Sequence, residues 1–500
     1  MSFQVPYVRD QEAPRLPPPE GMVGIAHWLR EGYFRSVGSG LVTLVLGALA
    51  VWIAWRVIDF AVLRAVWTGG SRDACLPAAG TAAGACWPFV ADRFGQWLYG
   101  FYPIGERWRV NLCFLAGLML IVPMLTPSFP WKMQNALLLL VVFPLFTLVM
   151  LTGGNFHLSI ADYATTIGFL LFLTCLVPVW LLGLAQGLLR NKIGAWLAGV
   201  AFVLWLAWIF AGPEPVAIGG MAVPLLPVSI LALLAVSAFL AVRLAIKGAG
   251  RPGIVVAANW GAVCLAALAI LVFLDADFGL VTVETAQWGG LTLTLVVSVT
   301  GIIASLPLGI LLALGRRSTM PVIRIVSICF IEVVRGLPLI SVLFMASVML
   351  PLFLPPGVNF DKLLRALIGV ALFSSAYMAE VVRGGLQAIP KGQYEGAMSL
   401  GLSHWQTMIK IILPQALKIA IPNIVGNFIS LFKDTTLVLV VGLFDLLGMA
   451  QTGLRDASWA TPTTAPTGYL VLALIYWAFC FSMSRYATFT ERRLNSARAR

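Results

Sequence analysis

The sequence predicts an all-α polytopic membrane protein of about twelve transmembrane helices. Sixty per cent of its 500 residues are hydrophobic, only 11% are charged, and the mean hydropathy is +0.93. Apolar runs of roughly 18 or more residues, the length that crosses a bilayer as a helix, recur through the chain. The expected spans are 38–58, 110–126, 135–151, 164–188, 194–211, 223–242, 254–274, 287–314, 321–350, 363–387, 415–444 and 468–489.

Lys and Arg alternate between the connections, and this alternation supports the count and predicts the orientation. With the N-terminus inside, the inner connections are basic, whereas 152–163, 212–222 and 275–286 on the other side contain no Lys or Arg. Such a bias marks the cytosolic side, so the net charge of +12 reflects topology rather than nucleic-acid binding. We expect a multi-pass membrane protein with cytosolic tails at 1–37 and 491–500.

The connection 59–109 breaks the charge rule and reads as a folded periplasmic cap on the three-helix region 38–151. Its aromatic residues favour a folded segment, and long loops escape the charge bias. It also contains Cys75 and Cys86. On the oxidising side these can form a disulfide, which would stabilise the loop by about 3 kcal/mol; the alternative is two unpaired thiols.

The remaining chain divides into two regions of contrasting polarity. Residues 152–283 hold four spans of Leu, Ala, Val and Trp with few polar residues, which we interpret as packing or a lipid-facing appendage. Residues 284–490 hold five spans rich in Gly, Pro, Ser, Thr and charge. Polar groups in lipid are costly and persist where they serve a path or a partner, so function is expected in 284–490.

The stretch 391–414 interrupts the apolar sequence and lies on the expected cytosolic side. Its larger apolar residues recur at helical spacing. They are Tyr394, Ala397, Leu400, Trp405, Met408 and Ile412. We predict two short helices with a bend at Gly401, closed by Pro414 before the next span. Such a shaped segment is typical of a docking device, although an ordinary amphipathic connector would show the same periodicity.

Two acid–base pairs stand at the i, i+3 spacing that brings side chains together on a helix. Glu332 and Arg335 precede Gly336-Leu-Pro338, which predicts a hinge beside an ion pair or a purely structural pair. Glu380 and Arg383 repeat the spacing and are expected at an inner gate or in support of 391–414.

Two groups of polar residues fall within spans and predict a path for a zwitterion. One group is Ser374, Ser375, Tyr377 and Met378, and the other is Asn423, Asn427, Ser430, Asp434 and Thr435. The second group follows a four-residue step, which gives one polar helix face beside Lys433. Hydroxyl, amide and ammonium donors suit a carboxylate, and Asp suits an ammonium group. Polar packing between helices is the alternative.

Catalysis is not expected. The chain has no Gly-rich phosphate-binding loop and no paired metal ligands, and its three histidines, His27, His157 and His404, are scattered. We therefore expect no metal site, no bound cofactor and no ATP hydrolysis by this chain.

Several motifs resemble the polar amino-acid uptake branch of ABC importer permeases. Glu395-Gly396-Ala397, Gly401 and Ile411-x-Leu413-Pro414 resemble that family's EAA loop, although the family usually has Ala at the position of Gly396. The runs Glu332 to Pro338, Ser375 to Gly385 and Lys433 to Leu437 also match, and the cap with Gly105 to Trp108 resembles the AapM-type permeases of the general L-amino acid system.

The resemblance implies an ATP-driven importer of L-amino acids working by alternating access. Its implied partners are a second homologous permease, a dimer of cytosolic ATPases that bind ATP and Mg, and a periplasmic amino-acid-binding protein. The residues implied in ATPase coupling are Glu395, Gly396, Ala397, Gly401, Leu402, Trp405, Ile411, Leu413 and Pro414. A secondary transporter, or a scaffold half that does not itself bind substrate, are the alternatives.

Overall fold

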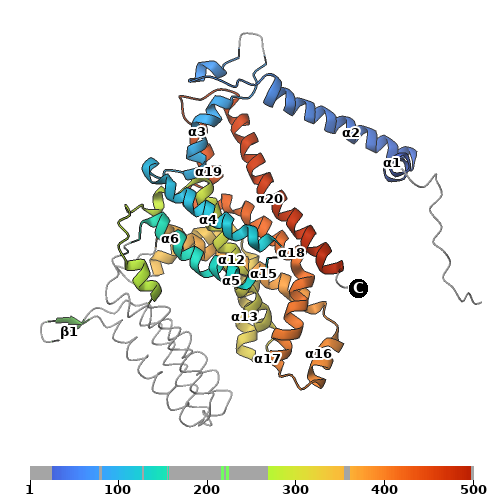
Figure 1. Cartoon of the computed structure of the whole chain (residues 1–500), viewed down its shortest axis with the longest axis vertical. Coiled ribbons are helices and arrows are strands. Elements are labelled where there is room, and N and C mark those ends of the chain that lie inside the picture. Colours follow the sequence, from blue (N-terminus) through green and yellow to red (C-terminus); the bar gives the residue numbers. More distant parts are fainter. Residues whose placement is uncertain are drawn as a thin grey trace, which may run out of the picture. The chain divides into compact units, whose positions relative to one another are not determined.

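The computed structural model describes residues 25–77, 82–126, 129–154, 156, 216–218, 221–223, 269–353 and 361–496 (Figure 1). Within them, seven helices are long and apolar enough to cross a membrane, and one bent helix pair is an eighth candidate. These eight match eight of the twelve expected spans. The expected spans 164–188, 194–211, 223–242 and 254–274 lie outside the described residues, apart from the helical residues 269–275.

The chain divides into two units, Met1–Ala91 with Asp456–Gly468, and Asp92–Arg455 with Tyr469–Arg500. The first unit begins with α1 (Ile25–Tyr33) and α2 (Val37–Ile58), and α2 continues as a π-helical turn over Asp59–Leu63. A capping box between Ser36 and Ser39 starts α2 by satisfying its free N–H groups. None of the apolar part of α2 is buried within the chain, as expected of a helix surrounded by lipid or a partner.

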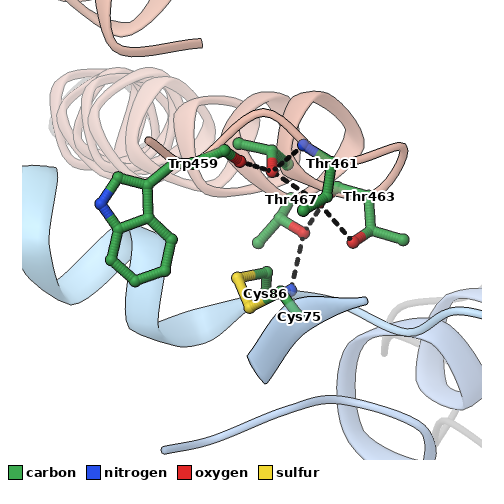
Figure 2. The surroundings of a disulfide bond; sticks show 7 residues. Cys75, Cys86, Trp459, Thr461, Thr463 and Thr467 are labelled. Carbon is green, nitrogen blue, oxygen red and sulfur yellow. Dashed lines mark hydrogen bonds between the residues drawn. A yellow bond between two sulfur atoms is a disulfide. The ribbon is translucent and has the colours of Figure 1, made fainter. Parts of the chain in front are cut away.

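The cap in the first unit is built around a disulfide between Cys75 and Cys86, which resolves the alternative left open by the sequence (Figure 2). Both cysteines are buried, and a short bridge pairs Val66 with Cys86. The Cys86 N–H donates to the Thr467 hydroxyl at 3.0 Å, which ties the disulfide to a segment almost 400 residues later in the chain. The described part of 59–109 in the first unit is therefore held by a disulfide and by hydrogen bonds.

The second unit contains the remaining elements. Before the stretch 157–268, called the large gap here, they are α3 (Trp87–Tyr99, which begins in the first unit), α4 (Arg107–Leu125), α5 (Lys132–Leu137), a π-helical segment (Leu138–Val142) and α6 (Phe143–Thr152). After the gap they are α12 (Gly290–Arg316), α13 (Pro321–Gly336), α14 (Leu339–Phe344), π-helical Met345–Met349, 3-10-helical Leu350–Phe353, α15 (Lys362–Gln387), α16 (Lys391–Ser399), α17 (His404–Thr407), π-helical Met408–Ile412, α18 (Leu413–Asp434), 3-10-helical Thr435–Val441, α19 (Leu446–Leu454) and α20 (Thr464–Ser496).

One departure from the all-α prediction is a short antiparallel hairpin. Strands β1 (Val216–Ile218) and β2 (Met221–Val223) pair Val216 with Val223 and Ile218 with Met221. The hairpin falls at the expected connection 212–222. In the sequence, two residues separate the strands, which is the spacing typical of a hairpin.

Small residues on α12 let neighbouring helices pack closely against it. A Cβ on Gly301 would lie 2.9 Å from Leu431 of α18 and Val370 of α15, and a Cβ on Gly309 would lie 2.7 Å from Met378 of α15. Helix α12 therefore lies at the centre of the second unit, in contact with α15 and α18. Small residues at a helix interface allow this close approach of the backbones.

Residues before and after the large gap share one hydrophobic core. Tyr102, Val110, Cys113 and Leu151 pack in the same cluster as Leu293, Val297, Val370 and Leu431. A second cluster joins α12, α13, α15 and α18 with residues of 391–414.

The segments that border residues 157–268 also contact each other. The Val283 N–H donates to the Thr152 carbonyl at 2.8 Å, and buried Arg109 donates to the Val281 carbonyl at 2.7 Å. The described segments before residue 157 and after residue 268 are therefore hydrogen-bonded to each other.

The segment expected as a single span at 321–350 is bent by 105° between Pro321–Gly336 and Leu339–Leu352. Gly336 ends α13, and Pro338, which lacks an N–H, stands just before α14. The kink predicted at this sequence is therefore confirmed.

Candidate functional site

The bend in 391–414 is built by two opposite capping motifs around Gly401. Gly401 adopts a left-handed φ of +73°, and the N–H groups of Gly401 and Leu402 donate to the carbonyls of Met398 and Ala397. These two bonds form a Schellman motif, which ends a helix and favours glycine. Ser403 and Gln406 then form a capping box that starts α17. The predicted two helices and bend are therefore present.

The predicted stop at Pro414 is wrong. Helix α17 continues through the π-helical turn Met408–Ile412 into α18, and His404–Val441 is one candidate span. Pro414 stands at the second position of α18, directly after the π-helical turn Met408–Ile412. The surrounding π turn accommodates the junction that we expected the proline to break.

The apolar residues of this segment divide between an inner and an outer face. Ala397, Met408 and Ile412 are buried in the second cluster, with Tyr394, Ile411 and Leu413 packed against it. Leu400 and Trp405 remain 78% and 64% exposed. Met398 and Ile409, which the sequence analysis did not select, are also exposed. We call Met398, Leu400, Trp405 and Ile409 the docking patch.

The other residues selected for coupling lie around this patch. Glu395, Gly396 and Pro414 are exposed and Leu402 is half-buried. A Cβ at Gly396 would meet nothing within 4 Å, so the Ala usual in the resembled family would fit there.

Polar contacts fix α16 to two other helices. Arg317, just after α12, donates to the Tyr394 hydroxyl at 3.1 Å, and its guanidinium lies 5.7 Å from the centre of the Tyr394 ring. The Gln415 side-chain amide of α18 donates to Gln393 at 3.1 Å. Helix α16 is thus attached to the end of α12 and to the start of α18.

An ion-pair cluster lies where α12, α13 and α15 meet, and Glu380 is its centre. One Glu380 oxygen is 2.8 Å from Arg316, and the other is 2.6 Å from Arg383 and 3.7 Å from Arg335. The predicted Glu380–Arg383 pair is confirmed. Three arginines face two glutamates, so the cluster keeps one net positive charge, and the Glu380 side chain is only 16% exposed.

The predicted pairing of Glu332 with Arg335 is wrong. Glu332 lies 2.9 Å from Arg316 of α12, while Arg335 faces Glu380 and stacks over the Tyr377 ring at 5.4 Å. Helical spacing brings two side chains near each other, but a third charge from another helix competes for them. Arg316 was not among the residues predicted for the site, because its contact with Glu332 joins two different helices.

The two groups expected along the substrate path occupy different environments. Ser374, Ser375 and Met378 are buried, and Met378 packs in the second cluster against Gly309. Ser375 donates to the Leu372 carbonyl at 2.7 Å, and Tyr377 is half-buried beside Arg335.

On α18, Asn423 and Ser430 are exposed, and Asn427 and Asp434 are half-buried. Thr435 is buried and donates to the Phe432 carbonyl. Among the described residues, no hydrogen bond joins the α15 group to the α18 group. Asn423 and Ser430 of α18, rather than the α15 serines, are therefore the members of these groups that are exposed on the surface of this chain.

Within the described part of the chain, no group of three or more His, Cys, Asp and Glu side chains could hold a metal ion. A polytopic helical body, a bent helix pair with an exposed apolar patch, and an ion-pair cluster where α12, α13 and α15 meet are features of a membrane transport subunit.

Comparison with known proteins gives the family. Residues 305–496 match the family described as the inner membrane component of binding-protein-dependent transport systems. The inner membrane amino-acid ABC transporter permease YhdY of Escherichia coli K12 is 39% identical, over 94% of this chain and 93% of its own length. The glutamate/glutamine/aspartate/asparagine permease BztC of Rhodobacter capsulatus is 38% identical over 98% of each chain. The L-cystine permease TcyB of Bacillus subtilis is 33% identical over 41% of this chain and 86% of its own.

The chain belongs to the amino-acid ABC transporter permeases. It is a membrane-spanning permease subunit of an ATP-driven importer in the inner membrane, and it is not itself an enzyme. The family works with an ATPase and a binding protein. This membership overturns the alternative of a secondary transporter.

Proposed function

We propose that this chain is one half of an AapM-type permease pair for L-amino acids. It receives substrate from a periplasmic amino-acid-binding protein and releases it to the cytosol by alternating access. The partner half is a second, homologous permease, and both chain termini are cytosolic. The charge bias of the connections supports this orientation, and the disulfide-bonded cap supports a periplasmic position for 59–109.

The observation that carries the proposal is the docking patch on 391–414. Four large apolar side chains stay exposed on a segment whose backbone is fixed by capping motifs and whose other face is buried. Exposed apolar patches on an ordered segment mark protein contacts, and tryptophan is prominent among contact residues that dominate binding energy. We assign this patch to a groove of the cytosolic ATPase dimer, on which ATP and Mg are bound, while this chain binds no cofactor.

The polar face of α18 is proposed to line the substrate path at the contact with the partner permease. Asn423 and Ser430 are exposed on a candidate span, where polar groups facing lipid are costly. Asn427 and Asp434 continue the same face. Polar packing against the partner permease, with this chain serving as a scaffold, is the alternative.

Mutation of the docking patch tests the proposed coupling. The complex is purified with its ATPase and partner permease, reconstituted in proteoliposomes, and assayed for amino-acid uptake. Trp405→Ala should lower the amount of bound ATPase and the uptake rate about tenfold, because burial of a tryptophan anchor is lost. Trp131→Ala is the matched control, since Trp131 is 67% exposed and Trp405 is 64% exposed. Equal ATPase binding in the two variants would contradict the proposal.

A second measurement separates the path from the scaffold. Asp434→Asn and Asn423→Ala should raise the KM for uptake or change the range of amino acids taken up, while ATPase binding stays intact. Unchanged transport by both variants, with assembly preserved, would assign the substrate site to the partner permease alone.

A further inference from the structure

Two consecutive arginines at the end of α12 hold different parts of the molecule. Arg316 contacts Glu332 and Glu380 in the ion-pair cluster, at 2.9 and 2.8 Å. Arg317 contacts Tyr394 of α16, the first helix of 391–414. Neighbouring residues at a helix end project about 100° apart, so one helix end reaches both structures at once. A single peptide bond therefore separates the residue that contacts α16 from the residue that contacts the ion-pair cluster.

Arg316 is held in the ion-pair cluster by two carboxylates and by close packing of the adjacent residue. The Arg316 side chain is 26% exposed, and its guanidinium bridges two carboxylates that belong to two different helices. Gly315, next to it, lies so close to Ser327 of α13 that an added Cβ would be 2.3 Å from the serine hydroxyl. The end of α12 thus cannot shift without moving α13 and the Glu380 carboxylate.

The contact between Arg317 and Tyr394 is weaker than the contacts of Arg316, and it can break and re-form. Arg317 is exposed and Tyr394 is half-buried, so water screens both the hydrogen bond and the cation–π contact. The second polar contact of α16, Gln393 with Gln415, reaches α18 instead. The Arg317–Tyr394 contact is therefore the polar link that leads from α16 toward Glu380.

We infer that Arg317 and Tyr394 are positioning residues that make movement of α16 reach the ion-pair cluster through the end of α12. When a docked protein displaces α16, Tyr394 carries Arg317 with it, and Arg316 changes its hold on Glu332 and Glu380. The link sets how much transport each ATP hydrolysis event produces. This inference rests on the proposed function of 391–414, and it adds the route by which that segment acts.

The decisive measurement is the ratio of amino acid taken up to ATP hydrolysed by the complete complex in proteoliposomes. Arg317→Gln should leave ATPase binding intact and lower this ratio roughly three- to tenfold, the size expected for losing one ordinary, solvent-screened hydrogen bond. Tyr394→Phe removes only the hydroxyl oxygen and should lower the ratio by less. The double variant should resemble Arg317→Gln rather than add to it, because both changes break the same contact.

Arg324→Gln is the matched control, because Arg324 is an exposed arginine of α13 with no polar side-chain contact among the described residues. It should leave the ratio unchanged. A normal ratio in both Arg317→Gln and Tyr394→Phe would overturn the inference while leaving the proposed function intact. Should Arg317→Gln fail to assemble, the conservative Tyr394→Phe variant decides. Failure of the proposed function is distinct, because Trp405→Ala would then retain its ATPase and its uptake.

Discussion

Gly401 shows how one residue shapes the coupling segment. Its left-handed φ of +73° ends α16, and no atom lies within 4 Å of an added Cβ, so the cost of a side chain is conformational rather than steric. L-residues in this conformation cost roughly 1 kcal/mol.

We predict that Gly401→Ala lowers the thermal stability of the complex and weakens ATPase binding, as measured by thermal unfolding and co-purification. Gly396→Ala is the control five residues earlier. Gly396 lies within α16 in open space, so alanine should strengthen the helix by about 0.5–1 kcal/mol and preserve uptake. Equal losses in the two variants would show that the αL position does not matter.

Asp445 is a second residue whose environment makes a measurable prediction. It lies between the candidate spans, is fully buried, and accepts hydrogen bonds from the N–H groups of Leu447 and Gly448 and from the Tyr476 hydroxyl. Burial raises the pKa of the Asp445 carboxyl, although these hydrogen bonds act in the opposite direction. The carboxyl therefore keeps its proton in the folded state at pH values where the unfolded chain has lost it.

This shift gives the sign of a pH dependence. The free energy of unfolding falls as pH rises from about 4, the ordinary pKa of Asp, to the raised pKa of the folded state. Over this range the unfolded chain releases the proton while the folded state retains it, and this favours unfolding. Asp445→Asn should reduce this fall while keeping the cap of α19. Asp445→Ala should cost about 1 kcal/mol at all pH values through loss of the cap. Tm measured between pH 4 and 8 checks both; parallel curves for wild type and Asp445→Asn would refute the assignment.

At the scale of elements, the junction of α12, α13 and α15 depends more on Glu380 than on Glu332. Glu380 faces three arginines and is 16% exposed, whereas Glu332 faces one arginine and is 55% exposed. Removing a shielded charge leaves its partners unopposed, and exposed pairs contribute little.

We therefore predict that Glu380→Gln destabilises the protein by about 2–3 kcal/mol. Glu332→Gln should cost less than about 1 kcal/mol. Thermal unfolding of the purified complex at low and moderate salt gives the comparison. The reverse order, or equal losses, would contradict the geometry of the cluster.

Local spacing predicted the elements better than it predicted their contacts. The bend at Gly401, the kink near Pro338 and the Glu380–Arg383 pair depend on residues within a few positions of each other, so the sequence contains the information. The Arg316–Glu332 contact depends on how α12 crosses α13, which no local pattern encodes. The burial of Met378, which was expected on the substrate path, could not be predicted for the same reason. It depends on how α15 packs against Gly309 of α12.

At the scale of the whole molecule, the second unit contains a core that joins described residues from before and after the stretch 157–268. The cluster that joins Tyr102 and Leu151 to Leu293 and Leu431 is made of residues on both sides of that stretch. The two borders are held together by the Val283–Thr152 and Arg109–Val281 hydrogen bonds.

We predict that replacing residues 157–268 by a flexible linker of about six Gly and Ser residues preserves assembly with the partner permease and the ATPase. Co-purification and uptake measure the result. Extending the deletion through Val283 should abolish assembly, because it removes the segment that bonds Thr152 and Arg109. Loss of assembly in the shorter deletion would show that the stretch contributes to the core.

The shared cluster also has a consequence for biosynthesis. Tyr102 and Val110 are translated early, yet their packing partners near Leu293 and Leu431 emerge from the ribosome some 180 to 330 residues later. The first spans therefore enter the bilayer before the helices against which they finally pack have been synthesised. Such long sequence separation slows folding and exposes intermediates to aggregation, so truncated nascent chains of this protein should be targets for membrane quality-control proteases.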